Sequence, residues 1–283
     1  MSPRTRRRLR LALLGALIAL LAIIVIEPQW LWPISPTEID ATRRLQPPSL
    51  AHPLGTDEAG GDMLARILAA TSLEVAIAAG SVLFAMLIAI PAGLIAGFRG
   101  GLVDEGVSLF SNAIFAFPAV LLAVLVVASF GPSVTTLVLV LGTVFIPHFY
   151  QLVRDQSMAI RERGFVLAAR VNGAGTGRIV VRHVLPTISA PLLVMLPQMM
   201  AMAILVEAGL SYLGLGVQPP RLTWGSLLLS SRSYYTLAPW YALTPGIVIT
   251  LATGSLMFLG DAVSRRLDPR LQSSQRETML KAG

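Results

Sequence analysis

Long apolar runs separated by short polar segments dominate the sequence. A membrane-spanning helix needs about 20 predominantly apolar residues, and six stretches approach or reach that length. These stretches are Leu11–Ile26, Leu73–Phe98, Val107–Phe130, Val134–Leu152, Ile188–Gly209 and Ala242–Val263. The pattern predicts an all-α integral membrane protein with six transmembrane helices, kinked where prolines such as Pro91, Pro118, Pro191 and Pro197 interrupt the apolar runs.

The first apolar stretch is the shortest and follows a cluster of arginines, a pattern shared with cleaved signal peptides. The sequence Glu-Pro-Gln-Trp at 27–30 follows it, where a signal peptide would have small residues for cleavage. Trp30 and Trp32 are typical of helix ends at a membrane interface. We therefore favour a first helix that is retained in the membrane.

The basic residues alternate between the segments that separate the six stretches. One set of alternate segments holds 17 of them and the other set holds 5. Because basic residues concentrate on the cytoplasmic side, we expect both termini and the 151–187 loop to be cytoplasmic. The 27–72 and 210–241 segments are then external. The predicted organisation is an N-terminal part (1–72), a five-helix core (73–263) and a cytoplasmic tail (264–283).

The composition agrees with a membrane protein located in the cell membrane. Hydrophobic residues make up 54% of the chain, the mean hydropathy is +0.71, and 13% of residues are charged. Soluble domains carry about 25% charged residues. The net charge of +7 is spread between apolar runs, so it does not indicate a nucleic-acid interface. The absence of cysteine excludes disulfides and thiolate metal sites.

The 151–187 loop is predicted to form a helix, a bend and a second short helix. Ala168 and Ala169 are strong helix formers, Gly173 can close the first helix in a left-handed conformation, and Pro186 is expected to end the second. Three basic side chains offer charge complementarity to a cytoplasmic partner: Arg170, Arg178 and Arg182. An amphipathic hairpin lying on anionic lipid is the alternative interpretation of this loop.

Glycines at 173, 175 and 177 also suggest a phosphate-binding loop, but that motif needs a following Lys and a preceding strand. The only Lys in the chain is Lys281, and no strand is predicted before these glycines. We therefore expect no nucleotide and no cofactor to bind this chain.

Two groups of acidic residues were considered as functional sites. His52, Asp57 and Asp62 could supply metal ligands, but a lone His among Gly and Asp residues is more typical of a turn. Carboxylates near membrane boundaries mark functional sites by default. For Glu207 and Asp261 we nevertheless favour a buried hydrogen bond or an interfacial helix end.

Several separated motifs together resemble a known family. The 151–187 loop is similar to a Glu-Ala-Ala motif followed by Gly and then Leu-Pro, here Ala168, Ala169, Gly173, Leu185 and Pro186, with His183 nearby. The runs His-Pro-Leu-Gly-Thr-Asp (52–57), Leu-Ser-Tyr-Leu-Gly-Leu-Gly (210–216) and Leu-Asp-Pro-Arg (267–270) match as well. The chain resembles the inner-membrane permease subunits of ABC importers, in particular the second permease of dipeptide, oligopeptide and nickel uptake systems.

The resemblance implies a type I ABC importer-like permease that has no enzymatic activity of its own. Its expected partners are a second permease in a heterodimer, one or two ABC ATPase subunits that bind ATP and Mg²⁺, and an external substrate-binding protein. The residues expected to contact an ATPase are Leu167, Ala168, Ala169, Arg170, Gly173, Arg178, His183, Leu185 and Pro186. The expected function is peptide import, with ATP hydrolysis driving alternating access.

Two positions depart from the family pattern, and several alternatives stay open. Leu167 stands where the family has Glu, and Gly61 stands where an Arg is usual. The solute could be a nickel complex or another small molecule. Other classes are an ATP-independent channel or secondary carrier, a membrane scaffold or receptor, and an intramembrane enzyme. The enzyme is disfavoured because His148 and Asp261 have no evident catalytic partner in the sequence.

Overall fold

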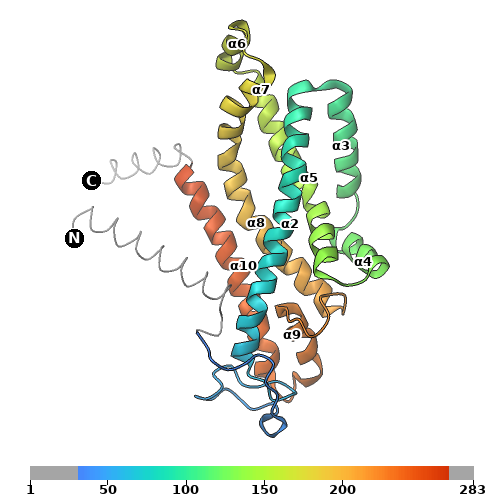
Figure 1. Ribbon diagram of the computed structural model, residues 1–283, viewed down its shortest axis with the longest axis vertical. Coiled ribbons are helices and arrows are strands. Elements are labelled where there is room, and N and C mark those ends of the chain that lie inside the picture. The colour runs from blue at the N-terminus through green and yellow to red at the C-terminus, as the bar shows by residue number, and fades with distance from the viewer. Residues whose placement is uncertain (1–30, 268–283) are drawn as a thin grey trace, which may run out of the picture. The chain divides into compact units, whose positions relative to one another are not determined.

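The computed structural model describes residues 31–267, and this part of the chain is helical, with one isolated β-bridge between Thr56 and Asp62 (Figure 1). The short 3-10 helices η2 and η4 span Ala41–Arg43 and Arg232–Tyr234, and a π-helical turn, η3, spans Val180–Val184. The α-helices are α2 (Met63–Arg99), α3 (Gly101–Phe115), α4 (Ala119–Phe130), α5 (Val134–Arg161), α6 (Gly164–Val171), α7 (Thr176–Ile179), α8 (Leu185–Tyr212), α9 (Trp224–Ser231) and α10 (Pro239–Leu267). The prediction of an all-helical fold is confirmed for these residues.

Four helical stretches are long and apolar enough to cross a membrane. Within the described residues they are Met63–Arg99, Val134–Arg161, Thr176–Tyr212 and Pro239–Arg266, with hydropathies between 1.7 and 2.3. The bent pair α3 and α4 raises the number to five if it counts as one span. The predicted helix Leu11–Ile26 and residues 268–283 of the tail lie outside the described residues. The six-helix count and the location of both termini therefore stay predictions.

The third predicted span, Val107–Phe130, is expected to kink at Pro118, and the structure instead divides it into two helices there. The chain forms α3 and α4, which are bent by 85° across residues 116–118. Pro118 lacks an amide hydrogen and disfavours a helical conformation at Phe117, so the helix ends before it and restarts at Ala119. Pro91, by contrast, lies inside α2. An apolar run by itself did not reveal which proline breaks the helix.

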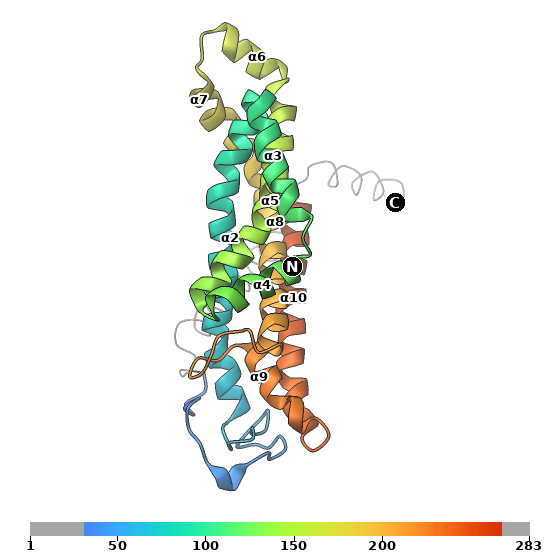
Figure 2. The same cartoon turned by 90° about the vertical axis from the view of Figure 1, so that its right-hand side faces the viewer.

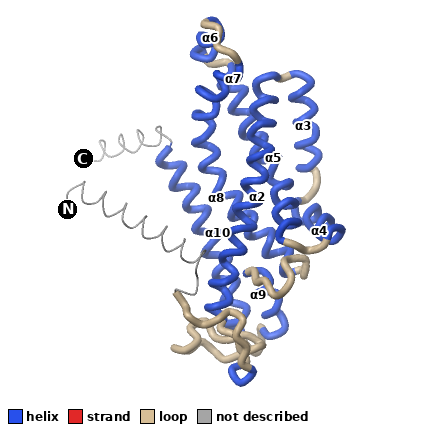
Figure 3. The backbone as a smooth tube through the Cα atoms, viewed as in Figure 1, coloured by secondary structure: helices blue, strands red, loops and turns tan. Residues whose placement is uncertain are grey.

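The described chain divides into two compact units, of which the first comprises 31–77 and Glu207–Thr250. Residues 31–62 of this unit are mostly loop (Figure 3). The buried Trp224 donates a hydrogen bond from Nε1 to the carbonyl of Ile67 at 3.3 Å, which ties α9 to α2. A Cβ on Gly225 would lie 2.7 Å from Ala208 Cα, so glycine is what allows α9 to approach α8 this closely.

The second unit comprises Ala78–Val206 and 251–267, and its helices α2 and α5 are also in close contact. A Cβ on Gly93 would lie 2.9 Å from Val153 Cβ, and small residues at such positions allow membrane helices to approach one another. Helix α3 is held to α5 by polar groups. Arg154 pairs with Asp104, and the Ser108 and Tyr150 hydroxyls are 2.9 Å apart.

Helices α6 and α7 lie at one end of the second unit, and α6 extends beyond the end of α3 (Figures 1 and 2). The connection between α5 and α8 that contains them is shorter than the predicted 151–187 loop. Helix α5 continues to Arg161 instead of ending at Leu152, because its polar last turns extend the same helix beyond the apolar run. Residues 151–161 of the predicted 151–187 loop therefore belong to α5. We call the remaining residues, 162–187, the α6–α7 segment.

Candidate functional site

The α6–α7 segment begins with a helix that presents different faces to the protein and to solvent. In α6, Val166 is fully buried and Ala169, three residues later, is half-buried, so both lie on one helical face. Leu167 and Val171 point away from this face, with 50% and 88% of their surface exposed. The helix is therefore anchored by one face and leaves apolar side chains without cover on the other.

Gly173 ends α6 as the sequence predicts. Its φ of +80° is left-handed, its N–H donates to the Arg170 carbonyl at 2.9 Å, and the Ala174 N–H donates to the Ala169 carbonyl at 2.9 Å. This pair of bonds is the Schellman arrangement, which satisfies carbonyls at a helix C-terminus. Gly173 therefore has a structural role in a cap. The following α7 contains only four residues.

Pro186 does not end the second helix, contrary to the prediction. Thr176–Tyr212 is one continuous helical stretch, in which the π-helical turn η3 precedes α8. The Leu185 N–H donates to the Val180 carbonyl, a bond five residues back in place of the usual four. A proline ring would crowd the carbonyl four residues before it, which is that of Arg182. The wider turn separates these groups and lets the helix continue.

The structure brings the predicted partner-contact residues to one short segment, and most of them face outward. Val184 and Ile179 are buried and anchor the segment together with Val166. The exposed predicted residues are Leu167, Ala168, Arg170, Gly173, Arg178 and Pro186, whereas Ala169, His183 and Leu185 are half-buried. Phe165 and Val181, which are 45% and 66% exposed, were not singled out from the sequence and extend the apolar surface.

The charges on this segment lack acidic partners. Arg170, Arg178 and Arg182 form no ion pair with any residue between 31 and 267. The Arg170 guanidinium instead lies 5.9 Å from the centre of the Phe98 ring, and His183 packs against Phe165 with ring centres 5.6 Å apart. Exposed apolar side chains next to unpaired cations are typical of a surface that another protein covers.

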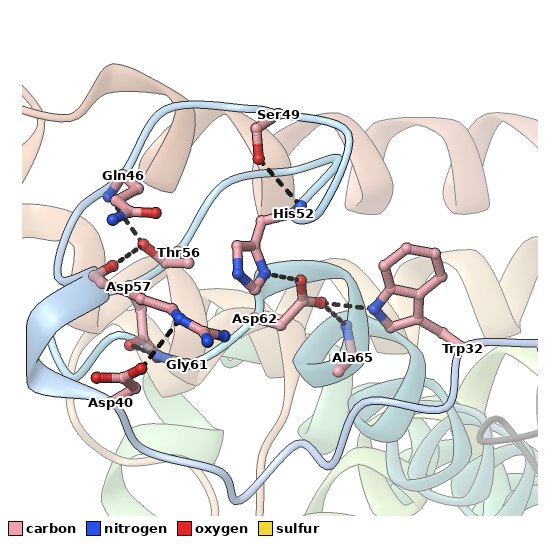
Figure 4. A network of polar contacts seen from close by, with 11 residues as sticks. Trp32, Asp40, Gln46, Ser49, His52, Thr56, Asp57, Gly61, Asp62 and Ala65 are labelled. Carbon is pink, nitrogen blue, oxygen red and sulfur yellow. Dashed lines mark hydrogen bonds and ion pairs between the residues drawn. The ribbon is translucent and has the colours of Figure 1, made fainter.

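The buried polar groups of the 31–62 segment have polar partners among the described residues, unlike the arginines of the α6–α7 segment (Figure 4). Asp57 is fully buried and accepts hydrogen bonds from the N–H groups of Ala59 and Gly61, both at 2.8 Å, and it pairs with Arg66. Its own N–H and carbonyl close the turn with Gly61 and Gly60. The prediction of a turn in this tract is confirmed.

A second buried acid, Asp62, has an equally complete set of partners. Its Oδ2 lies 2.7 Å from His52 Nδ1, and its Oδ1 accepts from Trp32 Nε1 at 3.0 Å and from the Ala65 N–H at 2.7 Å (Figure 4). The last bond caps the start of α2. Among the described residues no three His, Asp or Glu side chains gather around a common point for a metal. The alternative metal site at His52, Asp57 and Asp62 is therefore not formed in this part of the chain.

Gly61, one of the two departures from the family pattern, has a clear neighbour in the structure. A Cβ on Gly61 would lie 2.6 Å from Nε and 2.8 Å from Cζ of Arg66. The Arg66 guanidinium thus occupies the space beside Gly61 and pairs with Asp57. An arginine is present at this place in the fold, but it comes from α2 and not from position 61.

Polar contacts on the membrane helices were largely missed from the sequence. Glu207 is buried and accepts from Ser211 Oγ at 2.7 Å, which confirms the predicted buried hydrogen bond, whereas Asp261 is exposed. Glu74 on α2 is also buried and was not singled out. A charged residue inside the apolar run 73–98 was the available signal, since such residues are rare in membrane helices.

A comparison with known protein families decides the class of the chain. Residues 89–273 match the family described as the inner-membrane component of binding-protein-dependent transport systems. The chain belongs to this family. It is a permease component located in the inner membrane, and the channel, carrier, scaffold and enzyme alternatives are set aside.

Similar proteins cover nearly the whole chain. A putative peptide transport permease of Brucella suis is 39% identical, covering 94% of this chain and 89% of the relative. A dipeptide transport permease of Alkalihalophilus pseudofirmus is 36% identical, covering 93% and 87%. A nickel transport permease of Escherichia coli K12 is 34% identical, covering 94% and 96%. The predicted resemblance to the peptide and nickel branch is confirmed.

Solved structures support the fold. A chain of the MetNI methionine ABC transporter in an inward-facing conformation has a TM-score of 0.59 and 18% identity, covering 73% of this chain and 98% of that chain. A second crystal form of the same transporter gives a TM-score of 0.55 with 18% identity, covering 69% and 93%. The described helices therefore have the arrangement of an ABC importer permease.

Proposed function

We propose that this permease component is one of two pore-forming subunits of an ATP-driven peptide importer, and that the α6–α7 segment is where an ATPase subunit docks. The observation that carries the proposal is the combination of surfaces on this segment. Val166 anchors it, while Leu167 and Val171 are exposed and the nearby arginines are unpaired among the described residues. Such a surface loses apolar exposure and gains charge partners when a protein covers it.

The mechanism follows from the continuity of the segment with a long helix. Thr176–Tyr212 is a single helical stretch, so a force applied at α6 and α7 is transmitted to α8 as a rigid body. ATP and Mg²⁺ are bound by the ATPase partner, whose motion moves this segment. The permease then alternates between conformations open to either side. This chain contributes pore wall and a mechanical connection, with no bond-making chemistry.

The peptide substrate is supported by the relatives. Two of the three relatives compared above are described as peptide or dipeptide permeases, and the third is described as a nickel permease. The family description also includes a binding protein. We therefore propose an external binding protein that delivers peptides, together with a second, different permease chain as the partner across the pore.

Purification of the tagged full-length chain in mild detergent tests the assembly. We expect stoichiometric recovery of a second permease and of one or two ATPase subunits, identified by mass spectrometry. Ligands released from the associated binding protein would identify the solute as peptides or as a nickel complex. Recovery of the chain alone, with solute transport that needs no ATP, would contradict the proposed function.

Substitution of Gly173 tests the role of the α6–α7 segment. We expect Gly173→Val to reduce peptide uptake about tenfold or more, because a β-branched side chain at left-handed φ costs roughly 1–2 kcal/mol and distorts the cap of α6. The measurement is uptake into proteoliposomes compared with ATP hydrolysis by the reconstituted importer. Hydrolysis should continue while uptake falls, since the connection is impaired and the ATPase sites are intact.

Gly177→Val is the matched control. A Cβ on Gly177 also meets nothing within 4 Å, but its φ is not left-handed, so the substitution adds bulk without strain in the cap. We expect it to retain more uptake than Gly173→Val. Equal uptake by wild type and Gly173→Val would contradict docking through this segment.

A further inference from the structure

Two buried glutamates lie near one another in the first unit, and neither forms an ion pair with a described residue. Glu74 on α2 and Glu207 on α8 are each 1% exposed, and their hydrogen-bond donors meet at the start of α9, where Trp224 contacts Glu74 and the preceding Thr223 contacts the Ser211 hydroxyl that binds Glu207. The half-buried Arg66 of this unit pairs with Asp57. Arg221 is exposed and is not among the groups that act on either carboxyl. Within residues 31–267 the pair therefore lacks the cation that usually accompanies buried carboxylates.

Each carboxyl group has one oxygen with a hydrogen-bond donor from the protein. The Trp224 N–H, at the start of α9, donates to Glu74 Oε2 at 3.3 Å. The Ser211 hydroxyl donates to Glu207 Oε1 at 2.7 Å, and it lies 3.2 Å from the Thr223 hydroxyl. These donors, together with the helix N-terminus that carries the Trp224 N–H, can stabilise one negative charge. These donors are too few to stabilise two negative charges.

The remaining oxygens, Glu74 Oε1 and Glu207 Oε2, are buried and have no donor among the described residues. A buried acceptor without a donor is unfavourable, and two adjacent carboxylates in a medium of low dielectric constant repel strongly. A single hydrogen atom placed between these two oxygens removes both problems. Paired carboxyl groups elsewhere in proteins share a proton for the same reason.

We propose that Glu74 and Glu207 form a proton-binding site, in which one proton shared by Glu74 Oε1 and Glu207 Oε2 joins α2 to α8 and to the start of α9. The carboxyl that keeps the negative charge is stabilised by the Ser211 hydroxyl or by the Trp224 N–H. Loss of the proton places two negative charges side by side and separates these elements. The site does not depend on which solute the importer carries.

Infrared spectroscopy of the full-length protein in lipid nanodiscs tests the site. Exposed carboxyls are ionised at neutral pH, so the C=O stretch of a protonated carboxylic acid that persists there reports a buried acid. We expect such a band in the wild type, shifted by selective ¹³C labelling of glutamate and lost as the pH is raised. It should be absent from both Glu74→Gln and Glu207→Gln, and unchanged in Glu162→Gln, whose side chain is 76% exposed.

Thermal unfolding gives an independent readout. The wild type should lose stability as rising pH removes the shared proton, whereas Glu74→Gln, whose amide donates permanently to Glu207, should show little of this dependence. No glutamate band at neutral pH in the labelled wild type would overturn the proposal, whether or not the variants fold. Stability that depends on sodium or potassium at constant pH and ionic strength would also overturn it, because the pair would then hold a metal cation.

Discussion

The 31–62 segment and the α6–α7 segment (162–187) are both rich in charged side chains, but they differ in what those side chains contact. In the first, Asp57 and Asp62 are buried, and each accepts hydrogen bonds from backbone N–H groups and pairs with a basic side chain of the same unit. In the second, Arg178 and Arg182 are exposed without an ion pair to any described residue. Charge content alone therefore does not distinguish a folded structure from a docking surface.

Exposed apolar side chains do not distinguish the two segments. Residues 162–187 leave Val171 88% exposed and Leu167 50% exposed, and residues 31–62 also leave Leu50 and Ile39 exposed. The difference lies in the polar atoms, which in residues 31–62 build turns, with Gly60 in a left-handed conformation and the Thr56 hydroxyl donating to the Arg43 carbonyl. The buried acids of the 31–62 segment have partners within their own unit, including Arg66 and Ala65 of α2. Under the proposed function a partner covers the α6–α7 segment, so substitutions in the two segments should fail in different ways.

The largest expected effect is that of Asp57→Ala. The substitution leaves the Arg66 guanidinium without its acid and the Ala59 and Gly61 N–H groups without an acceptor. Breaking a buried pair in this way costs about 3–5 kcal/mol. We expect a large drop in unfolding temperature, measured by tryptophan fluorescence in detergent.

Asp40→Ala is the control for that experiment, because Asp40 is an acid of the same segment with an exposed carboxyl group. Hydrogen bonds from the Thr42 side chain and backbone lower the pKa of Asp40, and Arg43 pairs with it at 3.0 Å. Exposed pairs contribute little to folding stability, so Asp40→Ala should leave the unfolding temperature nearly unchanged. Similar unfolding temperatures for the two variants would contradict the assignment of Asp57 as a structural centre of the segment.

A smaller effect of a different kind is expected for Leu167→Ala. Leu167 is half exposed and contributes little to folding, but a partner that covers it gains about 1–2 kcal/mol from its side chain. We expect roughly tenfold weaker ATPase binding, measured with the purified permease pair in nanodiscs, and an unchanged unfolding temperature.

Val166→Ala is the matched contrast, since the neighbouring residue lies on the buried face. Its cost should be about 1–3 kcal/mol of folding stability. Leu167→Glu, which restores the residue that the family resemblance leads one to expect, should also weaken binding if the docking surface is apolar. Tighter binding by Leu167→Glu would show that the partner offers a basic group at this place.

The elements that could be predicted from the sequence are those whose cause is local. A run of apolar residues predicts α5 or α10 because every residue in the run must be placed in the membrane, and Gly173 predicts a helix cap because few other residues adopt its φ. The residues of the proposed docking surface lie within one short segment, so the sequence alone places them together, and their contact with an ATPase stays a prediction.

The elements that were missed depend on residues far apart in the sequence. The pair Glu74 and Glu207 forms only when α2 and α8 are packed together, and no spacing in the chain predicts it. Pro118 is visible in the sequence. Whether a proline within an apolar run kinks the helix or ends it depends on packing, which the sequence does not show.

The smallest expected effect is that of Arg178→Ala, and it tests whether the exposed charges of the α6–α7 segment act at the edge of the interface. Arg178 is exposed and has no acidic partner among residues 31–267, so folding should not change. A charge at the rim of an interface contributes roughly 0.5 kcal/mol and acts mainly on the association rate. We expect ATPase association to slow about twofold at low salt and to match the wild type at high salt, because screening removes the same interaction. Arg43→Ala in the 31–62 segment should leave the association rate unchanged at either salt concentration. A loss that persists at high salt would place Arg178 in the buried centre of the interface, and the docking surface would then extend from α6 across the bend to α7.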